Sequence, residues 1–120
     1  MDLLAPTPIF RMFDEAKTRE FYVGWLGFRV QFEHRYEPDM PLYMAIERGN
    51  CILHLSEHHG DTTPGSAIRI EVSDVDEFHR ELSSRPYGFA RPSVEPRPWG
   101  TREISLTDPS GNRLHFFSRC

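Results

Sequence analysis

A short segment in the middle of the chain recurs in similar form near its end, and this repeat constrains the fold more than any other feature. The two copies share a Gly-Asn pair, a Leu-His pair and a closing serine, and they run Arg48-Gly-Asn-Cys-Ile-Leu-His-Leu-Ser56 and Ser110-Gly-Asn-Arg-Leu-His-Phe-Phe-Ser118. In each copy a turn signal precedes alternating apolar residues, which is the pattern of a β-strand. The repeat indicates an internal duplication, so we expect the two halves of the chain to fold alike.

The second copy lies within a predicted hairpin over residues 98–117. Its turn is Asp108-Pro-Ser-Gly111, in which proline sets φ near about −65° and glycine accepts a positive φ. Apolar residues alternate on both sides of this turn, as they do in hairpin strands. His115 is therefore expected in the middle of the last strand.

The first half reads as a strand, a helix and three more strands. The strand covers residues 7–13, and the helix covers 15–26, with Asp14 as its N-cap and Gly27 as its stop. The three following strands are predicted over 28–36, 42–48 and 51–57, separated by proline and glycine turn signals.

The second half repeats this order after a linker, residues 58–66, that has no periodicity. A strand begins at Ala67, and a helix near 75–85 follows a capping box. A strand near 88–95 and the hairpin over 98–117 complete the set. The fold class is thus α+β, with two tandem βαβββ modules, residues 1–57 and 67–120, in one structural domain.

The charge and the apolar pattern exclude two classes of partner. The net charge of −4 and the lack of a basic run argue against nucleic-acid binding, because no cluster of cations neutralises phosphates. No segment reaches the ~20 apolar residues of a membrane span. The N-terminus has no signal-peptide pattern, and Cys51 and Cys120 are not placed for a structural disulfide. We therefore expect a cytoplasmic protein.

The order of motifs along the chain resembles the vicinal oxygen chelate superfamily, which includes glyoxalase I, extradiol dioxygenases, fosfomycin-resistance enzymes and bleomycin-resistance proteins. The resemblance covers almost the whole chain and is closest to the bleomycin-resistance branch. It rests on Thr7-Pro-Ile9, Phe21-Tyr22 before Leu26-Gly-Phe28, Pro98-Trp-Gly100, and Asp108-Pro-x-Gly-Asn112 before His115-Phe116. The resemblance implies curved mixed sheets around a cleft that holds a metal, a drug or both. It also implies a homodimer, in which the chains either exchange their first strands or lie side by side.

In metal-dependent members of this superfamily, ligands lie on the first and last strands of each half. The matching places here are near Thr7, at His54, near Ala67 and at His115, so two of the four carry strong ligands. A stable site needs about three or four protein ligands. We expect no cofactor, and a divalent metal held by His54 and His115 remains the alternative.

The linker carries a second candidate metal cluster, Glu57, His58, His59 and Asp61. Consecutive polar residues on a loop can converge on an ion, but a solvated linker explains them equally well.

Strand alternation predicts which side chains face the cleft. His54 and Ser56 point away from Leu53 and Leu55, and His115 points away from its apolar neighbours in the same way. Arg69 shares the exposed face of its strand, where an anionic or carboxylate-bearing ligand would meet it. These residues are predicted ligand contacts.

Trp99 is the strongest predicted contact, because a rigid indole between Pro98 and Gly100 suits stacking on a planar heteroaromatic group. Arg102 completes the predicted set. The alternative for Arg102, and for Glu103, is to pair with neighbouring charges.

Three functional hypotheses follow from these residues. The leading one is a small-molecule binding protein that sequesters a planar, antibiotic-type ligand and has no catalytic residue. The alternative is a metal-dependent lyase, isomerase or dioxygenase that uses His54 and His115, with Glu71 as a further ligand or base. The third is a domain with no small-molecule role.

Overall fold

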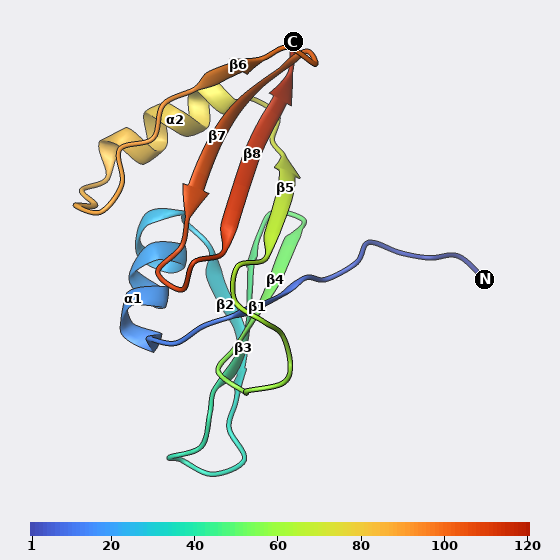
Figure 1. Ribbon diagram of the computed structural model, residues 1–120, viewed down its shortest axis with the longest axis vertical. Coiled ribbons are helices and arrows are strands. Elements are labelled where there is room, and N and C mark those ends of the chain that lie inside the picture. The colour runs from blue at the N-terminus through green and yellow to red at the C-terminus, as the bar shows by residue number, and fades with distance from the viewer.

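Two four-stranded sheets and two helical segments make up the protein in a computed structural model that describes all 120 residues (Figure 1). The first sheet contains β1 (Ile9–Arg11), β2 (Arg29–His34), β3 (Tyr43–Arg48) and β4 (Cys51–Ser56), and the second contains β5 (Ala67–Glu71), β6 (Glu95–Arg97), β7 (Thr101–Thr107) and β8 (Arg113–Arg119). The strand orders, β1-β4-β3-β2 and β5-β8-β7-β6, are equivalent. In each sheet the first strand runs parallel to the last, and the other pairs are antiparallel. The predicted α+β class with two tandem βαβββ modules is confirmed.

Each module carries one helical segment. The first is α1 (Glu15–Arg19), which continues as the π-helical turn η1 (Glu20–Trp25), and the second is α2 (Val75–Ser84). Both begin at the predicted caps, because Asp14 accepts from the backbone N–H of Lys17 at 3.0 Å and Asp74 accepts from Glu77 at 3.1 Å. The first segment ends before Gly27, whose φ of 81° fits the expected glycine stop.

The apolar faces of the two sheets and the helices form one core of 19 buried residues. Leu53 and Leu55 of β4 point into it, as do Leu114 and Phe116 of β8. The opposite face of each sheet therefore remains exposed. No helix of the protein is long and apolar enough to cross a membrane.

The strand predicted near 88–95 is wrong. Only Glu95–Arg97 form β6, and the preceding residues are irregular. Prolines at 86 and 92 remove backbone donors from that stretch. Pro96 is tolerated because β6 is an edge strand that pairs only with β7.

A buried polar network joins the two halves at the β7–β8 turn. The Tyr22 hydroxyl on η1 donates to Asp108 Oδ2 at 2.7 Å, and burial together with that carboxylate raises the pKa of Tyr22 well above its usual value. Asn112 Nδ2 donates to the carbonyl of Arg11 at 2.8 Å and to Asp108 Oδ2 at 3.0 Å. The turn therefore connects β1 and η1 of the first module to the hairpin of the second.

Candidate functional site

A pocket of about 450 Å³ opens on the exposed face of the second sheet. Its lining comes from β5, the β6–β7 hairpin and β8, and consists of Ala67, Ile68, Arg69, Arg97, Trp99, Glu103 and His115. Three predicted ligand contacts, Trp99, Arg69 and His115, thus meet in one place. We call this the Trp99 pocket.

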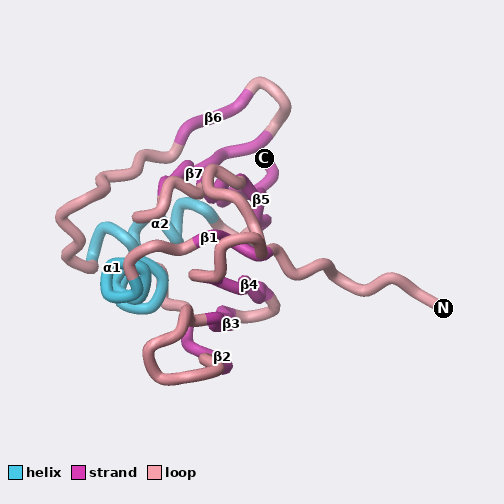
Figure 2. The backbone as a smooth tube through the Cα atoms, turned by 60° about the horizontal axis from the view of Figure 1, so that its bottom comes forward, coloured by secondary structure: helices cyan, strands magenta, loops and turns pink.

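Trp99 lies at the tip of the β6–β7 hairpin, which stands out at the edge of the sheet (Figure 2). The turn closes through a hydrogen bond from the Gly100 N–H to the Arg97 carbonyl at 3.1 Å, and Gly100 has a φ of 90°. Proline before Trp99 and glycine after it are the residues this turn requires. The turn leaves the Trp99 side chain 63% exposed, while its indole N–H donates to Glu103 Oε2 at 3.0 Å. One edge of the ring is anchored, and no other aromatic ring stacks on its faces.

Glu103 is the buried hub of the pocket. Its side chain is only 2% exposed and accepts two hydrogen bonds from Arg69, at 2.8 and 3.1 Å, and one from Thr101 at 2.6 Å. Together with the Trp99 bond, these contacts compensate the burial of a charge. The sequence predicts for Glu103 only a charge pair with a neighbouring residue. The alternation of Thr101, Glu103 and Ser105 opposite Ile104 was the signal that places it on the pocket face.

The pKa of Glu103 predicts an acid-dependent stability. Hydrogen bonds from Arg69 are the largest cause that lowers this pKa from 4.5 to about 2, with Thr101 and Trp99 adding to it. Because the folded-state pKa is lowered, the stabilisation is present above pH 4.5 and is lost as the pH falls toward about 2. We expect Glu103→Gln to remove this part of the acid dependence in urea unfolding curves recorded at about pH 5 and about pH 3. Glu95→Gln, an exposed neighbour, is the control, and an unchanged acid dependence in Glu103→Gln would contradict the assignment.

Arg69 is held between two groups. Besides its bonds to Glu103, its guanidinium lies 4.4 Å from the ring centroid of Phe117. Arg97 is held more loosely, since its Nε lies 3.9 Å from Glu103 Oε1 and its guanidinium forms no hydrogen bond within the protein.

His115 lines the pocket beside these charges. Its Nδ1 shares a hydrogen bond with the Ser105 hydroxyl at 2.8 Å, and its Nε2 has no partner in the protein. The pocket therefore offers one free imidazole nitrogen, two guanidinium groups and one indole ring.

A family model described as "Glyoxalase superfamily protein" matches residues 3–120. The chain belongs to the glyoxalase superfamily. A comparison with curated protein sequences found no match.

Solved structures agree with this family assignment. A bleomycin-binding protein in complex with bleomycin is 25% identical, with a TM-score of 0.74, and the match covers 98% of this chain and 100% of that one. A bleomycin-binding protein from Streptomyces verticillus, in complex with copper(II)-bleomycin, is 32% identical over 97% of this chain and 96% of that one, with a TM-score of 0.68. An antibiotic-binding protein from Streptomyces sp. CB03234, TnmS3, is 20% identical over the full length of both chains, with a TM-score of 0.70, and shares the fold. The predicted resemblance to the superfamily and to its bleomycin-resistance branch is confirmed.

In this glyoxalase-superfamily chain, His54 lies apart from the Trp99 pocket, on the exposed face of the first sheet. Its Nδ1 is 2.6 Å from the Tyr43 hydroxyl, and burial lowers the pKa of the His54 imidazole below its usual value, which favours the neutral form. The rings of Phe32 and Tyr43 pack edge-on against it, with centroids 5.6 and 5.3 Å away. We call Phe32, Tyr43 and His54 the aromatic patch.

The other two predicted contacts are engaged elsewhere. Ser56 is buried, donates to Asp61 Oδ2 at 2.7 Å and accepts from the N–H of His58 at 3.0 Å, so it orders the start of the linker. Arg102 lies on the helix side of the second sheet and binds Asp76 of α2 at 2.8 and 3.2 Å. Neither residue lines the Trp99 pocket.

The residues present do not fit a metal site. No group of three or more His, Cys, Asp or Glu side chains is placed to hold a metal ion. His54 and His115 belong to different sheets and share none of the larger pockets. In the linker cluster, Asp61 is bound by Ser56 and Glu57 accepts from the N–H of Leu42 at 2.8 Å.

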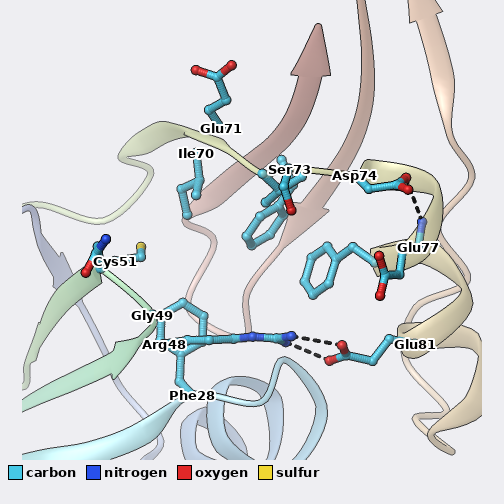
Figure 3. Close-up of a pocket in the computed structure, with 14 residues that line it drawn as sticks. Phe28, Arg48, Gly49, Cys51, Ile70, Glu71, Ser73, Asp74, Glu77 and Glu81 are labelled. Carbon is cyan, nitrogen blue, oxygen red and sulfur yellow. Dashed lines mark hydrogen bonds and ion pairs between the residues drawn. The ribbon is translucent and has the colours of Figure 1, made fainter.

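The largest cavity, about 680 Å³, lies between the modules, where the β3–β4 turn approaches α2 (Figure 3). Several of its polar side chains are already engaged, since Arg48 forms two hydrogen bonds with Glu81, at 2.6 and 2.8 Å, and Asp74 caps α2. None of the predicted ligand contacts lines it. This cavity lies at the interface between the two modules, and we place the candidate site in the smaller Trp99 pocket.

Proposed function

We propose that this protein binds planar heteroaromatic, antibiotic-type molecules and sequesters them without altering them, as a protein of the bleomycin-resistance type. The observation that carries the proposal is the Trp99 indole, which is exposed on the rim of a pocket while a buried carboxylate anchors its edge. A ring fixed in this way loses little freedom when a flat ligand stacks on it, so stacking retains most of its free energy. Solved structures of two similar proteins, 25% and 32% identical, contain bleomycin.

The pocket chemistry supports binding over catalysis. Glu103 keeps its charge at neutral pH and has its oxygens occupied, so it is a poor general base. Ser105 and His115 do form a hydroxyl–imidazole pair, but no carboxylate bonds the second nitrogen of the ring. Nucleophilic sites normally orient their base through such a third group.

A titration with bleomycin tests this function. We expect the drug to quench tryptophan fluorescence to a stoichiometric end point, and mass spectrometry to recover it unchanged after the protein is denatured. A chemically altered drug would refute sequestration. Stoichiometric Zn, Ni, Fe or Mn in protein purified without chelator would favour the enzyme that uses His54 and His115.

We also propose that the protein is a homodimer with its clefts at or near the interface. The Trp99 pocket is formed by the second sheet alone, and the aromatic patch is exposed on the first sheet, with Phe32 45% exposed. Residues 1–8 extend away from the body (Figures 1 and 2), and Leu3 and Leu4 are 90% and 87% exposed. A partner chain would cover these apolar groups and give the pocket a second wall. The first strands either exchange between chains or remain on their own β4.

Light scattering checks the assembly. We expect a mass of about twice 14.0 kDa at micromolar concentration. Changing Leu3 and Leu4 to serine should shift the population toward monomer, and Phe89→Ser, which removes an apolar side chain that is 78% exposed and outside the N-terminal segment, is the control. A mass of 14.0 kDa at every concentration would exclude the dimer.

The proposed location is the cytoplasm. Cys51 and Cys120 are both unpaired, which suits a reducing compartment.

A further inference from the structure

The charges that line the Trp99 pocket lie at different depths. Two cations, Arg69 and Arg97, have side chains that are 45% and 35% exposed, whereas the one carboxylate, Glu103, is 2% exposed. Two arginines and one glutamate leave one positive charge among the lining residues. A ligand that enters therefore meets guanidinium groups before it meets a carboxylate.

The carboxylate is also heavily engaged, with three hydrogen bonds on Oε2 and one on Oε1. Oε2 of Glu103 accepts from Arg69, Trp99 and Thr101, and Oε1 accepts from Arg69. A cationic ligand would either compete with the Arg97 guanidinium, 3.9 Å away, for the remaining acceptor site of Oε1 or displace one of these donors from a buried acceptor. An anionic ligand needs no such displacement.

The two arginines differ in how far their hydrogen-bond donors are already used. Arg69 uses both Nη atoms on Glu103. Arg97 touches Glu103 only through a 3.9 Å ion pair, so its hydrogen-bond donors are free. Arg97 also lies two residues before Trp99 in the same hairpin, and both residues line the pocket.

Of the other carboxylates on this face, Glu71 is paired with a cation, and Glu95 keeps its charge but is exposed to solvent outside the pocket. Glu71 pairs with Arg119 at 3.1 Å, and Glu95 accepts from the Ser93 hydroxyl at 2.7 Å. Neither of them lines the pocket. The net charge of −4 belongs to the whole chain, and charges farther than about 8 Å are largely screened at physiological salt.

We propose that the Trp99 pocket selects planar aromatic ligands that carry an anionic group, such as a carboxylate, phenolate or sulfonate, next to the ring. Trp99 stacks on the ring, and Arg97 binds the anion. Glu103 is a positioning residue that orients Trp99 and Arg69 and does not touch the ligand. This inference rests on the proposed function and narrows its ligand class.

Two probes of similar size and opposite charge test the selection. Quinoline-2-carboxylate and 2-(aminomethyl)quinoline share one ring system, and each is titrated while tryptophan fluorescence is recorded. We expect the carboxylate to bind at least ~10-fold more tightly, which is the scale of one hydrogen bond between charged groups. Raising the salt from about 0.05 M to about 0.5 M should shrink the ratio.

Variants assign the preference to a residue. Arg97→Gln should bring the two dissociation constants together, mainly by weakening the carboxylate. Arg102→Gln, an arginine on the opposite face of the sheet, is the matched control and should leave the ratio unchanged. Glu103→Gln should weaken both probes alike and alter the near-ultraviolet circular dichroism of Trp99, because the indole loses its charged anchor. If Glu103→Gln does not fold, the Arg97 and Arg102 variants still decide the question.

The outcomes separate this inference from the function on which it rests. Equal affinities, or tighter binding of the ammonium probe, with quenching that disappears in Trp99→Phe, would overturn the charge preference and leave the binding site in place. If neither probe binds at millimolar concentration, the charge preference fails. The titration with bleomycin then decides whether the proposed function fails with it.

Discussion

Replacing Asp108 with alanine is expected to lower the free energy of unfolding by about 3–4 kcal/mol, because several buried donors would lose their acceptor and each buried unsatisfied group costs ~1–3 kcal/mol. The carboxylate is 6% exposed and accepts from the Tyr22 hydroxyl, from the Asn112 side chain and from two backbone N–H groups of its own turn. These bonds join the two modules, so both should lose stability in one transition. Urea unfolding followed by circular dichroism measures the change.

Asp74→Ala is the matched control for that variant, since it removes an aspartate with one capping bond at the start of α2. It should lower the free energy of unfolding by about 1 kcal/mol. Tyr22→Phe combined with Asp108→Ala should be less destabilising than the sum of the two single variants, because the residues share a bond. Equal effects of Asp108→Ala and Asp74→Ala would show that the network does not hold the halves together.

Trp99→Ala should weaken ligand binding by ~1–3 kcal/mol, roughly 5- to 150-fold in dissociation constant, which is the usual loss for a central aromatic contact. The side chain is exposed and outside the core, so the free energy of unfolding should fall only by about 1 kcal/mol, the cost of the lost hydrogen bond to Glu103. Calorimetry measures the affinity, because the variant removes one of the two fluorophores and leaves only the buried Trp25.

Three further variants test whether the loss of affinity comes from the Trp99 ring. Trp99→Phe retains a ring but loses the hydrogen bond to Glu103, so its affinity should be intermediate. Phe89→Ala removes an aromatic side chain that is 78% exposed and outside the pocket, and should have no effect. His115→Ala should weaken binding only modestly if the protein sequesters its ligand. Unchanged affinity in Trp99→Ala for every heteroaromatic drug would mean that the site lies elsewhere.

Local sequence patterns were sufficient to predict much of this structure. Period-two alternation placed Arg69 and His115 on the exposed face of the second sheet, and His54 on that of the first, because neighbouring residues of a strand point to opposite faces. The caps Asp14 and Asp74 and the turn glycines at 100 and 111 are likewise set by short-range sterics and hydrogen bonds. The repeated segment indicated two similar halves, and the two sheets share one strand order.

The partners of the polar side chains depended on the tertiary structure. Arg69 and Glu103 are 34 residues apart, and they meet because β5 and β7 both flank β8. Long-range packing likewise brings Arg102 to Asp76 of α2. It also places Asp108 where its carboxylate accepts a hydrogen bond from Tyr22 of the other module. The sequence determined which face of its strand each residue occupies, since that depends on neighbours in the chain. Only the folded structure decided which outward residues share a pocket, because strand order and register join segments that the sequence keeps apart.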